Sequence, residues 1–178
     1  MTRAAFLFAL LLAASPLRAQ SDGLDDLFDA LRQPDSSGWE AVEDRIWEEW
    51  SQSGSAAMDL LLERGREAIG EGEHATAIEH LTALVENAPD FAEGWNARAT
   101  AYFHVDRYGP ALADIARALT LEPRHFAALA GLGRIFEETG DIEGALEAYR
   151  RAAAIHPRRP DLREAVERLE AELQGKSV

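Results

Sequence analysis

Cysteine is absent from this chain of 178 residues, so the sequence excludes disulfides, thiolate metal sites and a cysteine nucleophile. Basic residues are scarce as well: 18 lysines and arginines stand against 32 acidic residues and give a formal net charge of −14. Nucleic acids and anionic membrane surfaces favour a positively charged protein surface. We therefore expect neither of them as a partner.

The short motifs of catalysis and cofactor binding are also missing. The sequence contains no glycine-rich phosphate loop, no H-E-x-x-H and no G-x-S-x-G pattern. The histidines do not form a metal site, because His74 and His80 are six residues apart and fall on different helix faces. We therefore expect a protein that is not an enzyme and that holds no cofactor and no metal.

Residues 1–19 have the layout of a secretory signal peptide. Arg3 gives a positive start, residues 4–14 form an apolar run, and Ala19 is the small residue before the expected cleavage site. The apolar run is too short for a bilayer, which needs about 20 residues. We expect export to a bacterial periplasm, where exported proteins without cysteine are common, and no stable membrane anchor after cleavage.

A block of 34 residues, written three times, dominates the rest of the chain. Pro89, Pro123 and Pro157 stand 34 residues apart, each near the end of a block that reads as helix, turn and helix. The three blocks cover residues 58–91, 92–125 and 126–159. Self-similarity at this period indicates repeats that stack and share a continuous core.

Small residues recur where the two helices of a block must approach closely. They are Gly65, Ala99 and Gly133 at the eighth position, and Ala77, Ala111 and Ala145 at the twentieth. With Leu61, Trp95 and Leu129 at the fourth position and proline at the thirty-second, the blocks resemble the tetratricopeptide repeat (TPR).

The resemblance implies an all-α fold, a TPR-type α-solenoid in which antiparallel helix pairs stack into a right-handed superhelix. It also implies a concave groove, built from the first helix of each repeat, that binds a protein or peptide partner without a cofactor. In this frame the groove would carry eleven partner-binding residues: Asp59, Leu62, Arg66, Ile69, Glu93, Asn96, Thr100, Phe103, His104, Arg134 and Glu137.

Arg66 and Arg134 hold the same position two repeats apart and flank Asn96 and Thr100. This arrangement favours hydrogen bonds to an extended peptide or its carboxylate, although a merely solvated groove is the alternative. Members of the family that clamp a C-terminal dicarboxylate use lysine, asparagine and arginine at set positions. Those positions hold Leu62, Arg66, Ala97, Ala127 and Gly131 here, so that clamp is not supported.

Two charged features have structural interpretations. Arg98 lies at a position that is normally apolar and faces the helix of Asp114, which predicts a structural ion pair between them. The inter-repeat turns carry the one basic edge of the protein, formed by His125, His156, Arg158 and Arg159. This edge is either a second contact surface or a solvated rim.

The segments on either side of the repeats predict caps. Residues 20–57 carry two helical patterns, the second with Trp39, Trp47 and Trp50, and are interpreted as a degenerate helical hairpin that packs against the first repeat. Its alternative is an aromatic binding patch. Residues 160–174 predict a capping helix, and residues 175–178 a frayed tail.

The sequence therefore predicts a non-catalytic scaffold or adaptor that binds a peptide or helix in its groove, for an envelope complex. The alternative is a structural protein that forms homo-oligomers through its tryptophan-rich hairpin. A third hypothesis is an accessory domain for an envelope enzyme.

Overall fold

The computed structural model describes residues 16–33 and 38–176. Most of the predicted signal peptide and the last two residues of the predicted tail lie outside this range. Within it the chain forms nine α-helices and no strand. They are α1 Pro16–Arg32, α2 Trp39–Trp50, α3 Ala56–Gly70, α4 His74–Asn87, α5 Ala92–Phe103, α6 Tyr108–Leu121, α7 Phe126–Glu138, α8 Ile142–Ile155 and α9 Pro160–Lys176.

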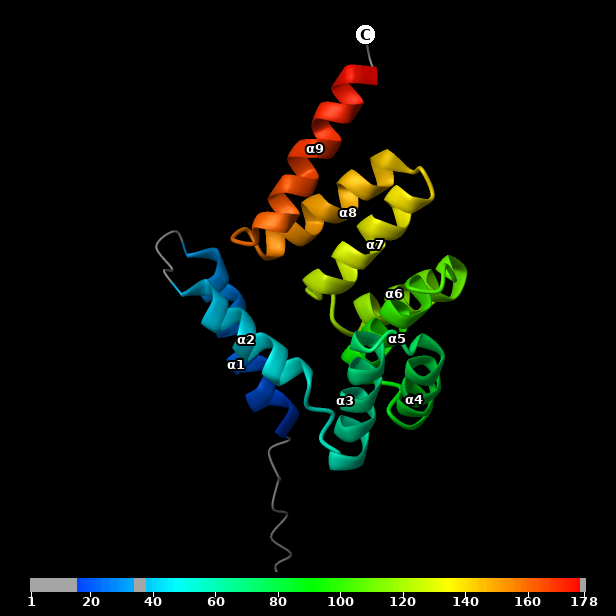
Figure 1. Cartoon of the computed structure of the whole chain (residues 1–178). Coiled ribbons are helices and arrows are strands. Elements are labelled where there is room, and N and C mark those ends of the chain that lie inside the picture. The colour runs from blue at the N-terminus through cyan, green and yellow to red at the C-terminus, as the bar shows by residue number, and fades with distance from the viewer. Residues whose placement is uncertain (1–15, 34–37, 177–178) are drawn as a thin grey trace, which may run out of the picture.

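The helices α3–α8 form three packed pairs, and α9 packs against α8 at the end of the stack (Figure 1). Two glycines show why small residues recur in the repeats. A Cβ atom on Gly65 would lie 2.5 Å from the side chain of Leu81, and one on Gly133 would lie 2.8 Å from the ring of Tyr149. The absence of a side chain lets α3 pack closely on α4, and α7 on α8.

The hairpin of α1 and α2 does not extend this stack but lies beside it (Figure 1). Its apolar residues form one buried cluster with Phe126, at the start of α7 in the third repeat. Trp50 stacks on His125 with ring centroids 4.1 Å apart, and Trp47 meets Phe126 edge to face at 5.9 Å. The expectation that the tryptophans pack against the first repeat is therefore wrong.

The reason lies in the inter-repeat turns of the third repeat, which offer large rings to the hairpin. Phe126, His125 and His156 are all completely buried, and Trp39 meets the ring of His156 edge to face at 5.4 Å. Aromatic pairs in such offset and edge-on arrangements add stability beyond the area they bury. The turn that follows the first repeat lacks such a set, because Ala92 and Ala88 hold the positions of Phe126 and His156, and only Phe91 supplies a ring, at the position of His125.

Polar contacts tie the hairpin to the same turns. Arg124 donates to Asp25 at 2.5 Å, Arg159 donates to Glu43 at 3.3 Å, and Nε2 of His156 lies 3.2 Å from Glu43. The predicted basic edge is thus neither a solvated rim nor an open surface in this region, because the acidic hairpin of the same chain covers it.

Among residues 16–33 and 38–176, no helix is both long and apolar enough to cross a membrane. No group of three or more histidine, aspartate or glutamate side chains among these residues could hold a metal ion.

Candidate functional site

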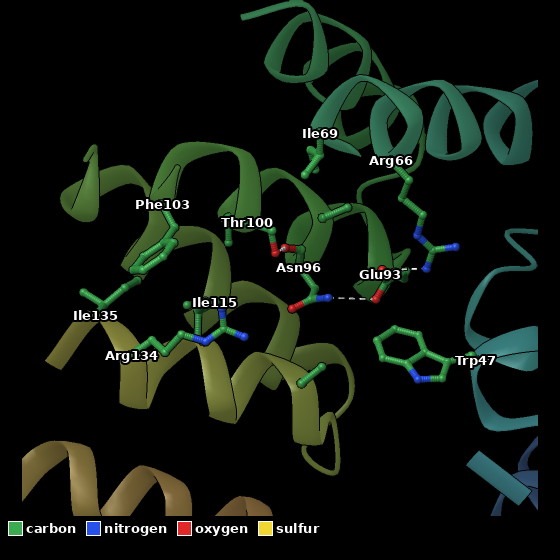
Figure 2. A pocket seen from close by; sticks show the side chains of 14 residues that line it. Trp47, Arg66, Ile69, Glu93, Asn96, Thr100, Phe103, Ile115, Arg134 and Ile135 are labelled. Carbon is green, nitrogen blue, oxygen red and sulfur yellow. Dashed lines mark hydrogen bonds and ion pairs between the residues drawn. The ribbon is translucent and has the colours of Figure 1, made fainter. Parts of the chain in front are cut away.

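A cavity of about 460 Å³ lies on the side of the stack formed by the first helices of the three repeats (Figure 2). The third repeat contributes α7, the second α5, and the first α3, while Trp47 enters from α2. The side chains that line the cavity belong to Trp47, Arg66, Ile69, Glu93, Asn96, Ala97, Ala99, Thr100, Phe103, Ile115, Ala127, Arg134 and Ile135, with Gly131 completing the wall.

Glu93 lies at one end of this cavity and is the most completely buried carboxylate there, with 3% of its surface exposed. Oε1 accepts from Nη2 of Arg66 at 2.7 Å, and Oε2 accepts from Nδ2 of Asn96 at 3.0 Å. Burial disfavours the charged carboxylate, but the hydrogen bond from His125 and the charge and hydrogen bond of Arg66 outweigh it and hold the pKa of Glu93 below its ordinary value.

His125 completes this network and links it to the hairpin. Nδ1 of His125 accepts the backbone N–H of Ala128 at 3.2 Å, which caps α7, so Nδ1 carries no hydrogen. Nε2, 2.9 Å from Glu93, must therefore be the nitrogen that donates to the carboxylate. Trp50 stacks on the ring of His125, so His125 connects the hairpin to Glu93 in the wall of the cavity.

Arg66 is held on two sides. Besides Glu93 it donates from Nη1 to the hydroxyl of Ser51 at 2.9 Å, just beyond the end of α2. Its guanidinium carbon also lies 5.8 Å from the centre of the Trp47 ring, a cation–π contact. Arg66 therefore supports the structure, and its side chain, 38% exposed, also lines the cavity where the sequence predicted it.

Arg134 holds the position of Arg66 two repeats later, yet it is exposed and makes no ion pair or hydrogen bond with a described residue. The residue in the register of Glu93 is Asp161, which is bound instead by Arg159 at 3.0 and 2.8 Å. Arg134 thus presents its charge to the cavity (Figure 2).

The rest of the cavity is apolar or internally satisfied. Ile69, Ile115, Ile135 and Phe103 supply its hydrophobic surface, with Phe103 and Ile135 at the end away from Trp47 (Figure 2). The hydroxyl of Thr100 donates to the carbonyl of Asn96 at 3.1 Å. The site therefore offers a ligand an apolar surface with one unpaired cation beside it.

The structure places seven of the predicted groove residues in this cavity: Arg66, Ile69, Glu93, Asn96, Thr100, Phe103 and Arg134. Leu62 is not among them. It is 1% exposed in the core between the first and second repeats, so its assignment to the groove is wrong. A leucine on this helix gains more by burial against Leu81 and Ala97 than by facing solvent.

The other three predicted residues lie outside the cavity. Asp59 accepts from the backbone N–H of Ser53 at 2.7 Å, and His104 stacks on His74 at 4.8 Å. Desolvation, followed by the nearby His74 and Arg134, lowers the pKa of His104. Glu137 is paired with Arg168 at 2.6 Å and faces a second cavity.

Arg98 and Asp114 form the ion pair that the sequence predicts, with two hydrogen bonds of 2.7 and 2.8 Å. The Arg98 guanidinium carbon also lies 5.1 Å from the centre of the Trp95 ring and 5.6 Å from that of Tyr102. Since none of these residues lines the cavity, their role is to join α5 to α6.

The sequence did not predict the link between Glu93 and His125. It assigned Trp47 to a cap, with an aromatic binding patch as the alternative, and the structure places Trp47 in the cavity wall. A signal for both existed in the unusual aromatic content of one short segment, 39–50, and of the turn at 125–126. Pairing the two segments would have brought the hairpin to the third repeat.

Comparisons with known proteins agree with the helical stack. The tetratricopeptide repeat family matches residues 62–109 and 105–160. A TPR repeat-containing protein of Rhizobium etli is 37% identical over 155 residues, which are 85% of this chain and 75% of the relative. This chain belongs to the tetratricopeptide-repeat family.

Other TPR proteins resemble it over a smaller part of their length or only in fold. Small glutamine-rich tetratricopeptide repeat-containing protein 2 of Saccharomyces cerevisiae is 30% identical over 74% of this chain, which spans only 38% of that relative. The first TPR of Spaghetti (RPAP3), solved bound to the HSP90 peptide SRMEEVD, superposes with a TM-score of 0.64. It is 22% identical and covers 67% of this chain and 95% of its own, a likeness that shows the fold.

Proposed function

We propose that this TPR protein is a non-catalytic interaction scaffold that binds a peptide segment of a partner protein in the cavity between its first helices. The observation that carries the proposal is the composition of that cavity, which combines Phe103 and three isoleucines with the unpaired guanidinium of Arg134. Ligand sites are typically apolar with a few polar groups that fix orientation, in volumes of about 300–1,000 Å³.

A peptide fits this site better than a helix laid along the whole groove. Trp47 closes the end of the cavity near Glu93, so a rigid helix continuing in that direction would meet the hairpin (Figure 2). The similar TPR of Spaghetti (RPAP3) was solved with a short peptide, which supports the same class of ligand here.

A cavity-filling variant tests this function. A Cβ on Gly131 would lie 3.6 Å from Ile115, an ordinary contact, so Gly131→Leu should fold while occupying the cavity. We expect Gly131→Leu to weaken, by about tenfold or more, the binding of peptides that a displayed peptide library yields as ligands of the wild-type chain. Gly109→Leu is the matched control, because a Cβ there meets nothing within 4 Å and the residue lies outside the cavity. Equal capture of peptides by both variants and the wild type would contradict the proposal.

We also propose that residues 1–19 are a signal peptide and that the partner belongs to a periplasmic envelope complex. The positive start at Arg3, the apolar run and Ala19 support this. Mass spectrometry of the protein recovered from an exporting bacterium should find a chain that begins at Gln20. Recovery of the intact N-terminus in the cytoplasmic fraction would overturn the export proposal.

Self-association through the hairpin remains the alternative hypothesis, although Trp39, Trp47 and Trp50 contact rings of the same chain. Light scattering after size-exclusion chromatography decides between the two. We expect a monomer.

A further inference from the structure

We propose that the partner segment has an ordered pattern, in which an apolar side chain is followed by a carboxylate and then by a basic side chain. This inference rests on the proposed function and specifies the ligand of the same site. The carboxylate is bound by Arg134, the apolar side chain occupies the cavity between Trp47 and Phe103, and the basic side chain faces a second cavity beside α9.

The first step concerns the anion. Two arginines line the first cavity, and one of them, Arg66, is held by Glu93; outside the cavity, Arg159 holds Asp161. Asp161 is in the register of Glu93, so its capture by Arg159 is what leaves Arg134 without its equivalent partner. The unpaired guanidinium of Arg134, beside an apolar surface, binds a carboxylate through charge-assisted hydrogen bonds.

The second step concerns the apolar side chain. Ile69, Ile115 and Ile135 line the cavity together with Trp47, which comes from the hairpin and not from a repeat. The position of Trp47 is fixed by its edge-to-face contact with Phe126 and by its hydrogen bond to Glu43 at 3.3 Å. The hairpin thus determines which side chain fits, and Trp47 is a specificity-determining residue outside the repeats.

The third step concerns the basic side chain. A second cavity of about 710 Å³ adjoins the first at Arg134 and lies between α7 and α9. Four acidic residues line it: Glu137, Glu138, Asp161 and Glu164. Arg168 and Arg159 neutralise Glu137 and Asp161. Glu138 and Glu164 make no ion pair with a described residue and attract a cation.

The order of charges along the ligand follows from this layout. Arg134 lines both cavities, so a carboxylate bound to it lies between an apolar subsite and an acidic one. A segment with the same residues in another order would bring a cation against Arg134 or a carboxylate against Glu138 and Glu164.

A set of synthetic peptides of equal length tests the pattern with the purified full chain. The host is a short Gly-Ser peptide with phenylalanine, glutamate and lysine in that order. A second peptide carries the three residues in the reverse order, because the peptide chain can run in either direction along the groove. Controls carry glutamine for glutamate, or place lysine in the middle. Free and amidated C-termini separate a C-terminal carboxylate from an internal acidic side chain. Affinities are measured by calorimetry at low salt, because screening weakens exposed charge pairs.

We expect the glutamate peptide to bind about tenfold more tightly than its glutamine and lysine-centred controls, since hydrogen bonds to charged groups contribute about that much. Arg134→Gln should abolish this difference, whereas the exposed Arg151→Gln on α8 should preserve it as the matched control. Trp47→Ala should weaken all the phenylalanine peptides and leave the preference for glutamate intact.

The outcomes separate the two proposals. If peptides bind without preference for glutamate, or if Arg134→Gln retains the preference, the ordered pattern is wrong and the proposed peptide binding stands. If no peptide from this set or from a displayed library binds the wild-type chain, both proposals fail.

Discussion

The first and third repeats place an arginine at the same position, but the two side chains have different surroundings. Arg66 is bound by Glu93 and Ser51 and lies against Trp47, whereas Arg134 faces a cavity without a partner among the described residues. The repeat period positions both arginines equally. The difference comes from residues that do not repeat.

The hairpin contributes to this difference, because it brings Ser51 and Trp47 to Arg66. It contacts the first repeat through Ser51 and Ser53, and the third repeat through the rings of Trp47 and Trp50. Solenoid repeats ordinarily contact only their neighbours. Here one non-repeating segment connects the two ends of the stack and closes one end of the groove. The comparison teaches that the groove of this protein is specified by its hairpin as well as by its repeats.

The largest difference in unfolding free energy is expected between alanine variants of Glu93 and Asp161, the two carboxylates at equivalent repeat positions. Glu93→Ala removes a buried partner from Arg66, Asn96 and His125 and should cost about 3–5 kcal/mol of unfolding free energy, measured in urea. Asp161→Ala should cost no more than about 1 kcal/mol, because its side chain is 58% exposed. Equal losses would show that the two sites are not distinguished by burial.

A smaller difference in unfolding free energy is expected between glutamine variants of Arg66 and Arg134. Arg66→Gln leaves the buried carboxylate of Glu93 with fewer donors and should cost about 1–3 kcal/mol. Arg134→Gln should stay within about 0.5 kcal/mol of the wild type, since no described residue pairs with it. Thermal or urea unfolding of both variants in one buffer checks this, and a clear loss for Arg134→Gln would indicate a contact absent from the structure.

The pH dependence of stability sharpens the comparison further. Burial alone would raise the pKa values of Glu43 and Glu93. For Glu43, the hydrogen bond from His156 and the charge of Arg159 outweigh burial and leave the pKa below the ordinary 4.5. For Glu93, the hydrogen bonds from His125 and Arg66 have the same effect. A carboxyl with a lowered pKa stabilises the folded state above 4.5, and this contribution is lost as the pH falls through the folded-state value.

We therefore expect unfolding free energy to fall as the pH drops below about 4.5, and to fall less steeply in Glu93→Gln. Urea midpoints across the acid range measure the slope. Identical slopes for the variant and the wild type would remove Glu93 from the account of acid stability.

The parts of the fold that repeat were accessible from the sequence. The glycines at 65 and 133 and the alanines at 77 and 145 indicated close helix pairs, and the structure shows those contacts. The ion pair between Arg98 and Asp114 was also foreseen, because both residues occupy fixed places in one repeat. Periodicity is informative here since every repeat meets the same packing demand.

The parts that occur once were not accessible in the same way. Contacts such as Glu43 with His156 join residues 113 positions apart and leave no periodic trace. The frame also placed Leu62 in the groove, although burial against the second repeat decides its orientation. Arg66 was correctly placed in the groove, but its pairing with Glu93 on the next repeat was not foreseen.

The most direct test of the central claim, that the hairpin docks on the third repeat, should also have only a small effect on stability. The chain contains no cysteine, so Asp25→Cys with Arg124→Cys introduces a unique pair at an exposed ion pair, which should cost at most about 1 kcal/mol. A short thiol-reactive cross-linker should join the two positions within one chain in high yield. Failure to cross-link them, with efficient linkage of Asp25→Cys to a cysteine placed at exposed Leu60 on the first repeat, would contradict the account.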